Sequence, residues 1–251
     1  MIVWREKLLA MAVHFVVTAV FAGIAAALIF LVWFPAPFYT MIGGTELFML
    51  VVGCDLALGP LLSLVIYDSR KPRRALITDY SIVGIVQIAA LVYGVYIVAG
   101  TRPVAVAFSG DRIEIVSARD VNDKELAAAR DPQYATLPWT GPRYVMIDVP
   151  PADHDDALFS SLEGNEEHTR PKFYQPYEFA LPEIRRRAGT IDQLIAKHRR
   201  DKPLIDTAVA AANIPVERIR WLPVRHVKGF WTVLIDIDTG RPVEYFALDP
   251  Y

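Results

Sequence analysis

The side chain best suited to chemistry in the first hundred residues is the carboxylate of Asp55, which lies inside a long apolar run. An ionisable residue in such a run is costly, so it indicates a hydrogen-bonding partner or a function. Asp55, Gly59 and Ser63 recur every four residues, which places them on one face of a helix. Pro60 leaves the carbonyl of Leu56 without its helical donor. The pattern predicts a polar stripe that another backbone can approach closely.

Polar and small side chains also occur in the two neighbouring apolar runs. Gln87 and Gly94 fall on one stripe of the run over 80–98, and Tyr93 lies near the depth of Asp55. His14 lies in the first run. The Asp55 stripe either fixes the packing of these helices through hydrogen bonds or contacts a visiting helix, and the sequence supports both alternatives.

Catalysis by paired carboxylates is a further alternative. Intramembrane aspartyl proteases need two carboxylates in one site. Asp68 and Asp79 lie at the far ends of their segments, too far along the helix to pair with Asp55. His154-Asp155-Asp156 fits a helix cap followed by acidic first-turn residues. We therefore expect no catalytic, cofactor-binding or metal-binding residues.

The elements that must position these side chains are three apolar helices, predicted at about 8–34, 47–67 and 80–98. Of the 251 residues, 53% are hydrophobic. Each helix reaches the roughly 20 residues that a membrane span needs. The composition predicts a membrane protein with a three-helix transmembrane domain over 1–100.

Basic residues predict the orientation of these spans. Arg5 and Lys7 precede the first helix, the link over 35–46 has no Lys or Arg, and the link over 68–74 is strongly basic. Short basic links stay in the cytoplasm. We expect a multi-pass protein of the bacterial inner membrane with a cytoplasmic N-terminus and a periplasmic domain over 101–251.

The second domain reads as α+β, because β-branched segments and helical patterns alternate irregularly. Strands are predicted at 104–108, 112–118, 144–149, 218–226 and 231–237, and the last begins a hairpin that turns at 238–240. Helices are predicted at 123–130, 155–163, 182–200 and 204–212, and Gly189 is expected to break the third.

Charge and cysteine content exclude several function classes. The chain has 26 basic and 28 acidic side chains and a net charge of −2, so nothing indicates a nucleic-acid partner. The single cysteine cannot form an intrachain disulfide. No phosphate-binding loop or nucleophile motif points to a small-molecule substrate.

Several motifs in the first 110 residues together resemble the type IV pilin accessory proteins of the TfpX/TfpZ family. They are Arg5-x-Lys7-Leu8, His14, Trp33-Phe34-Pro35-x-Pro37-Phe38, Gly43-Gly44, Asp55-Leu56-x-Leu58-Gly59-Pro60-Leu61-Leu62, Lys71-x-x-Arg74, Asp79, Gln87-Ile88-Ala89-Ala90-Leu91-x-Tyr93-Gly94 and Arg102-Pro103-Val104. The resemblance implies an inner-membrane accessory that binds or stabilises its cognate pilin and modulates pilus assembly, without enzymatic activity. Its partners would be that pilin and membrane lipid.

A membrane-anchored sensor or transporter subunit is another alternative. Three helices enclose little of a transport pathway, and paired broken helices of the transporter kind are absent from the sequence.

Overall fold

The computed structural model describes residues 2–68 and 70–251, and the chain divides into two compact units, Met1–Thr101 and Arg102–Tyr251. The side chains of residues 2, 3, 44, 45, 47, 51 and 55 also lie outside the described part. The predicted role of the Asp55 carboxylate therefore falls outside the described residues.

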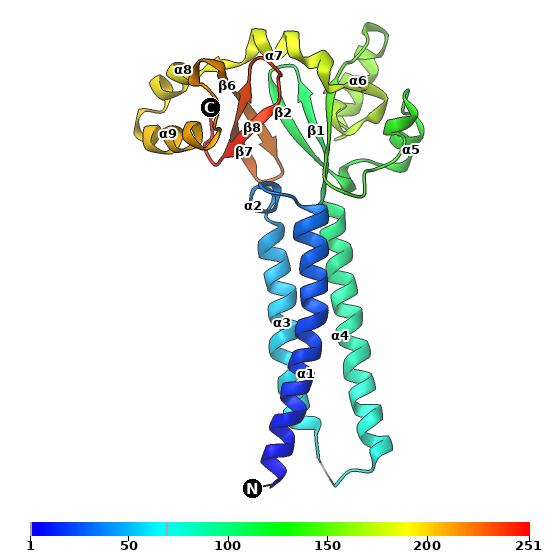
Figure 1. Ribbon diagram of the computed structural model, residues 1–251. Helices are drawn as coiled ribbons and strands as arrows, with labels where there is room; N and C mark the ends of the chain where they lie inside the picture. The colour runs from blue at the N-terminus through cyan, green and yellow to red at the C-terminus, as the bar shows by residue number, and fades with distance from the viewer. Residues whose placement is uncertain (1, 69) are drawn as a thin grey trace. The chain divides into compact units, whose positions relative to one another are not determined.

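The first unit consists of long helices joined by short links (Figure 1). They are α1 (Ile2–Ala27), a π-helical continuation (Leu28–Trp33), the short α2 (Phe38–Ile42), α3 (Gly44–Ile66) and α4 (Arg73–Thr101). Each predicted span coincides with one long helix. α4 begins at Arg73 rather than at residue 80, because the helix continues through the basic turn directly after Pro72.

Within the described residues, three helical stretches are long and apolar enough to cross a membrane by length and composition: Trp4–Trp33, Phe48–Ile66 and Arg73–Thr101. Many of their large apolar side chains point outward. The most exposed include Leu9, Ile24, Leu31, Leu50, Val65, Ile85 and Val92. A soluble monomer rarely exposes so continuous an apolar surface.

Packing in the first unit centres on α3. Both α1 and α4 pack along α3, whereas the backbones of α1 and α4 approach each other at few positions. Phe30 in the π-helical stretch makes edge-to-face contacts with Tyr39 and Phe48, with ring centroids 6.0 and 5.1 Å apart. These contacts join the end of α1 to α2 and α3.

The second unit contains one mixed sheet of eight strands, in the order β4-β3-β1-β2-β6-β7-β8, with β5 paired to β6 (Figure 1). β1 pairs with β3 and β2 pairs with β6 in parallel, and the other pairings are antiparallel. The strands are β1 (Pro103–Ser109), β2 (Arg112–Ser117), β3 (Arg143–Ile147), β4 (Tyr174–Pro176), β5 (Gly189–Thr190), β6 (Ile219–His226), β7 (Gly229–Asp236) and β8 (Pro242–Phe246). The α+β prediction for this unit is confirmed.

The helices of the second unit are short. They are α5 (Asp123–Ala127), α6 (His154–Leu162), α7 (Leu181–Arg187), α8 (Ile191–Lys197) and α9 (Lys202–Ala211). The predicted helix over 182–200 is broken at Gly189, as expected, and the break forms strand β5. Thr190 then caps α8 in a capping box with Gln193.

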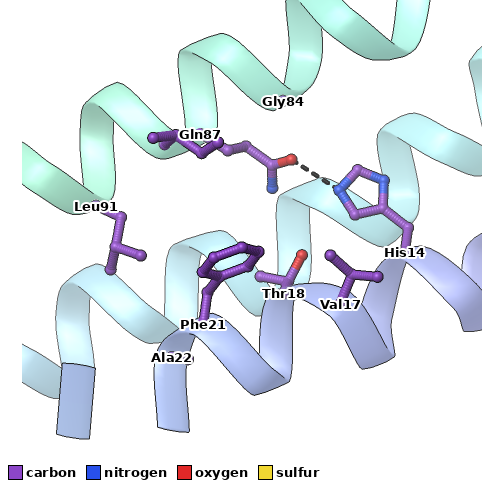
Figure 2. A pocket seen from close by; sticks show the side chains of 9 residues that line it. His14, Val17, Thr18, Phe21, Ala22, Gly84, Gln87 and Leu91 are labelled. Atoms are coloured by element: carbon purple, nitrogen blue, oxygen red, sulfur yellow. Dashed lines mark hydrogen bonds between the residues drawn. The ribbon is translucent and has the colours of Figure 1, made fainter. Parts of the chain in front are cut away.

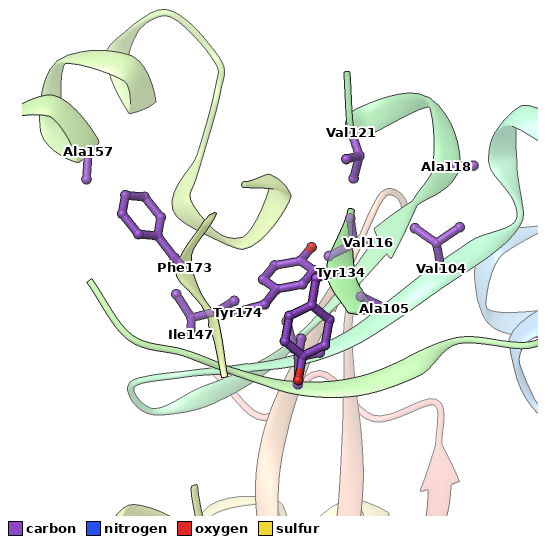
Figure 3. Close-up of a cluster of buried hydrophobic side chains, with 12 residues drawn as sticks. Val104, Ala105, Val116, Ala118, Val121, Tyr134, Ile147, Ala157, Phe173 and Tyr174 are labelled. Atoms are coloured by element: carbon purple, nitrogen blue, oxygen red, sulfur yellow. The ribbon is translucent and has the colours of Figure 1, made fainter. Parts of the chain in front are cut away.

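Two clusters of buried side chains stabilise the second unit. One gathers residues of β1, β2 and β3 with Ala157 of α6, Phe173 and the edge-to-face pair Tyr134 and Tyr174 (Figure 3). The other joins α8 and α9 to β6, β7 and β8 through Leu194, Ile205 and Leu234. The first cluster therefore fixes α6 to one part of the sheet, and the second fixes α8 and α9 to another.

Candidate functional site

Three of the predicted site residues meet in one hydrogen-bonded chain that joins the three long helices. His14 of α1 lies between Ser63 of α3, at its Nδ1, and Gln87 of α4, whose Oε1 is 2.7 Å from its Nε2. Because the Gln87 oxygen can only accept, Nε2 carries the imidazole proton, and Nδ1 accepts from the Ser63 hydroxyl. A histidine thus ties α3 and α4 to α1.

Gly59 makes this arrangement sterically possible. It lies one turn before Ser63 on the same face of α3 and is buried. A β-carbon built at Gly59 would lie 2.3 Å from Gln87 Nε2 and 3.1 Å from His14 Nε2. The small residue therefore lets the two polar side chains lie directly against the α3 backbone, as close-approach stripes do between membrane helices.

The remaining predicted residues are distributed differently. Pro60 and Gly94 are buried, whereas Tyr93 points outward and is 66% exposed. The structure thus brings His14, Gly59, Ser63 and Gln87 together and leaves Tyr93 apart. The carboxylate of Asp55 lies outside the described side chains.

An apolar hollow opens between α1 and α4 beside this hydrogen-bonded chain. It has a cavity volume of about 100 Å³. Figure 2 shows the hydrogen bond between Gln87 and His14, with the side chains of Phe21 and Leu91 beside it. The lining residues are His14, Val17, Thr18, Phe21, Ala22, Gly84, Gln87, Ile88 and Leu91.

A second, larger hollow continues the first toward the N-terminal end of α1. Its cavity volume is about 510 Å³, and it shares His14, Val17 and Gly84 with the first. We call the two together the α1/α4 groove. Glu6 and Tyr80 also line it, and sequence reasoning did not single them out. Both lie near the ends of their apolar runs, where a polar residue gives little signal.

Several polar atoms of the α1/α4 groove have no hydrogen-bond partner among the residues that the structure describes. They are Glu6 Oε2, the Tyr80 hydroxyl and Gln87 Nε2. Gln87 lies midway along α4 (Arg73–Thr101), and its Oε1 already accepts from His14. Gln87 Nε2 itself is buried against the backbone of Gly59, so its N–H groups are enclosed between α3 and α4.

The second unit has a charged cluster of its own. Arg225 of β6 donates through Nε to Glu114 of β2 at 2.7 Å and through Nη2 to Glu166. Burial raises the pKa of Glu114 to about 7, against the opposing effect of the Arg225 guanidinium. Burial also lowers the pKa of His168, which lies 3.6 Å from Glu166. Arg225 thereby links two strands of the sheet to the loop after α6.

The acidic sequence at the start of α6 has a structural role. Asp155 and Asp156 lie in its first turn, and His154 Nε2 donates to the carbonyl of Val149 at 3.0 Å. Asp156 accepts from Arg170 and Lys172, both at 2.7 Å. The described residues include no group of three or more side chains that could hold a metal ion.

The carboxylates at the link between α3 and α4 are engaged in ion pairs. Asp79 lies 2.6 Å from Lys71 Nζ, and Asp68 lies 3.1 Å from Arg70 Nη2. Hydrogen bonds from Arg70 lower the pKa of Asp68 to about 2. Neither carboxylate is placed for a catalytic pair.

Comparison with known proteins identifies relatives of this chain. A family model described as fimbrial assembly protein FimB matches residues 2–43. Among curated proteins of Dichelobacter nodosus, the fimbrial assembly protein of serogroup I is 30% identical over 94% of this chain and 95% of its own length. The protein of serogroup E1 is 29% identical over the same shares, and that of serogroups C1 and C2 is 38% identical over 47% of this chain and 89% of its own. No solved structure matches. These relatives confirm the resemblance to type IV pilin accessory proteins.

Proposed function

Because the chain belongs to the fimbrial assembly protein family, we propose that it is an inner-membrane accessory of type IV pilus biogenesis that binds its cognate pilin. The proposed binding element is the α1/α4 groove, which receives an apolar helix of the pilin. The three candidate spans support membrane insertion. The basic residues at 5, 7 and 70–74 support a cytoplasmic N-terminus and a periplasmic second unit.

The observation that carries this proposal is the apolar groove between two candidate membrane spans. Its lining includes the exposed apolar side chains of Leu9, Val13 and Val17, together with the polar residues Glu6 and Tyr80. A protein helix can pack against the apolar side chains and also offer hydrogen-bonding groups to the polar residues, whereas a lipid acyl chain offers none. The groove therefore favours a protein helix over lipid alone.

Gly59 and Ser63 contribute to this groove from behind. Both are buried against His14 and Gln87, so they support the groove from within and do not contact the pilin helix. In this proposal the polar stripe of α3 holds the chain's own helices together, and the pilin helix contacts the apolar side chains of the groove.

Site-specific photo-crosslinking tests this proposal. A photo-reactive residue at Val17, which is 48% exposed and lines both hollows, is expected to capture the pilin in intact membranes. Leu58, which is 58% exposed on α3 and does not line the groove, is the matched control. Equal capture from both positions, or capture of lipid alone from Val17, would reject the groove.

The enzyme and transporter alternatives have no comparable support. Asp68 and Asp79 are both held in ion pairs, and the family is described by fimbrial assembly rather than by a reaction. The proposal therefore assigns no catalytic residue.

A further inference from the structure

Helix α6 of the second unit is oriented with its apolar side chains outward. Leu158, Phe159 and Leu162 are 61%, 66% and 78% exposed. The side that faces the domain carries Ala157, which is buried, and Ser161, whose hydroxyl donates to the Ala157 carbonyl at 2.8 Å. An ordinary surface helix shows the opposite arrangement, with its large apolar side chains toward the core.

Ion pairs hold α6 in this orientation. Arg170, whose side chain is only 5% exposed, donates to Asp156 at 2.7 Å and to Glu125 at 3.3 Å. Lys172 lies 2.7 Å from the same Asp156 carboxylate and 3.4 Å from Asp153. Rotating the helix to bury its leucines would leave the buried Arg170 guanidinium short of a partner, which is unfavourable. The exposed apolar face is therefore built into the fold.

The outward face is acidic as well as apolar. Asp155 and Glu163 are exposed at its two ends, and neither takes part in an ion pair within the described ranges 2–68 and 70–251. Asp155, Leu158 and Leu162 follow one another at helical spacing. An anionic lipid surface would be repelled by this pattern, whereas an apolar hollow bordered by Lys or Arg would complement it.

The size of the patch indicates how its partner is held. Three exposed side chains on a nine-residue helix are far smaller than the roughly 1,200 Å² that a stable free-standing interface buries. A contact of this size suits a partner that is already bound elsewhere on the same chain, because tethering raises its effective concentration to the millimolar range. A homodimer through α6 alone would lack the necessary area.

We propose that the outward face of α6, formed by Asp155, Leu158, Phe159, Leu162 and Glu163, docks into a basic-rimmed apolar hollow on the extramembrane part of the pilin. This inference rests on the proposed function, in which the α1/α4 groove holds the pilin helix. The mode is that of an apolar helix face in a groove, with anchors at i, i+3 and i+4. Specificity for one pilin then comes from the periplasmic unit, where the charges lie.

Photo-crosslinking at Phe159 in the full-length chain tests this docking in cells that produce the pilin. Phe159 is expected to capture the pilin, and Val216, which is 48% exposed on the segment before β6, is expected not to. Adducts from Phe159 with a second copy of the chain, with lipid only, or with nothing would overturn the inference.

The Val17 crosslink separates this inference from the proposed function. Capture from Val17 without capture from Phe159 removes the α6 contact and leaves the groove. Capture from Phe159 alone supports the α6 contact but rejects the groove as the place where the rest of the pilin is held. No pilin adduct from either position rejects both.

A paired variant measures the contribution of the apolar face. Leu158→Ser with Leu162→Ser changes only exposed side chains, so the thermal midpoint and the cellular level of the protein are expected to stay unchanged. Co-purified pilin is expected to fall about tenfold. Asp155→Lys tests the charge and is also expected to reduce the amount of co-purified pilin. Unchanged pilin recovery with both variants would contradict the docking.

Discussion

At Gly59 the fit between α3 and α4 depends on the absence of a β-carbon. The methyl group of Gly59→Ala would fall 2.3 Å from Gln87 Nε2, the far end of a flexible side chain. We expect Gln87 to swing aside and lose its hydrogen bond to His14, at a cost of about 1 kcal/mol. The thermal midpoint of the purified protein in detergent measures this loss.

Gly53→Ala is the matched control on the same helix, because a β-carbon at Gly53 meets no atom within 4 Å. It should leave stability unchanged or raise it slightly, since alanine favours the helix. The Gln87→Ala background supplies a double-mutant cycle: there, Gly59→Ala should cost much less. An equal cost in both backgrounds would show that Gln87 is not the group that Gly59 accommodates.

Glu114 gives the second unit a characteristic pH dependence. Its folded pKa of about 7 lies above its ordinary value of 4.5, so the folded state binds more protons between these pH values. The contribution of Glu114 to stability is therefore present at acidic pH and is lost as pH rises through this window, by up to about 3 kcal/mol.

Glu114→Gln removes this titration. We expect the difference in unfolding free energy between wild type and variant to shift against the wild type as pH rises from about 4.5 to about 8. His168 titrates in both proteins, so its effect largely cancels in the difference. A wild-type advantage that grows with pH would mean that the Arg225 ion pair outweighs burial at this carboxyl.

At the scale of elements, α6 offers two neighbouring aspartates with different surroundings. Asp156 accepts from the buried Arg170, whereas Asp155 is exposed in the same first turn without an ion pair among the described residues. Asp156→Asn should destabilise the protein by about 1–3 kcal/mol, because it removes a charged partner from Arg170. The retained pair with Glu125 limits the loss.

Asp155→Asn is the matched control, because both residues interact similarly with the helix dipole. Denaturant unfolding of the two variants should place Asp155→Asn within about 0.5 kcal/mol of wild type. Equal destabilisation by both substitutions would assign the effect to the dipole and not to Arg170.

Sequence periodicity predicted where the helices and strands lie better than it predicted which of their faces are buried. The three long helices and five of the strands follow from apolar length and β-branched runs, whereas strands β4 and β5, of three and two residues, are too short to leave such a signal. The outward face of α6 was not predictable, because Leu158 and Leu162 are held outward by Arg170 and Lys172, which lie outside the helix. The residue pattern within α6 does not indicate ion pairs with residues outside the helix.

The candidate site shows the same limit. The four-residue spacing of Gly59 and Ser63 is enough to place them on one face of α3. The link from Ser63 through His14 to Gln87 depends on how three helices meet, which spacing within one helix cannot specify. Tyr93 shares the apolar run of Gln87 but projects from another side of α4.

At the scale of the whole molecule, the proposed topology makes a definite prediction about accessibility. Cys54 is the single cysteine of the chain and is exposed, so Cys54→Ser provides a background without thiols. Thr40, Arg74 and Ala210 are exposed and lie in the first link, the basic link and α9. A single cysteine at each position reports its side of the membrane through a membrane-impermeant maleimide.

With a cytoplasmic N-terminus and three spans, cysteines at Thr40 and Ala210 should react in intact spheroplasts, and the cysteine at Arg74 should react only after lysis. The basic residues over 70–74 oppose translocation of that link across the membrane. All copies of the protein should therefore show the same labelling pattern. The reverse pattern would place the second unit in the cytoplasm, where it could not meet the periplasmic part of a pilin. Reaction at all three positions before lysis would mean that α3 and α4 do not cross the membrane. The α1/α4 groove would then face water and could not receive a membrane-embedded helix of the pilin.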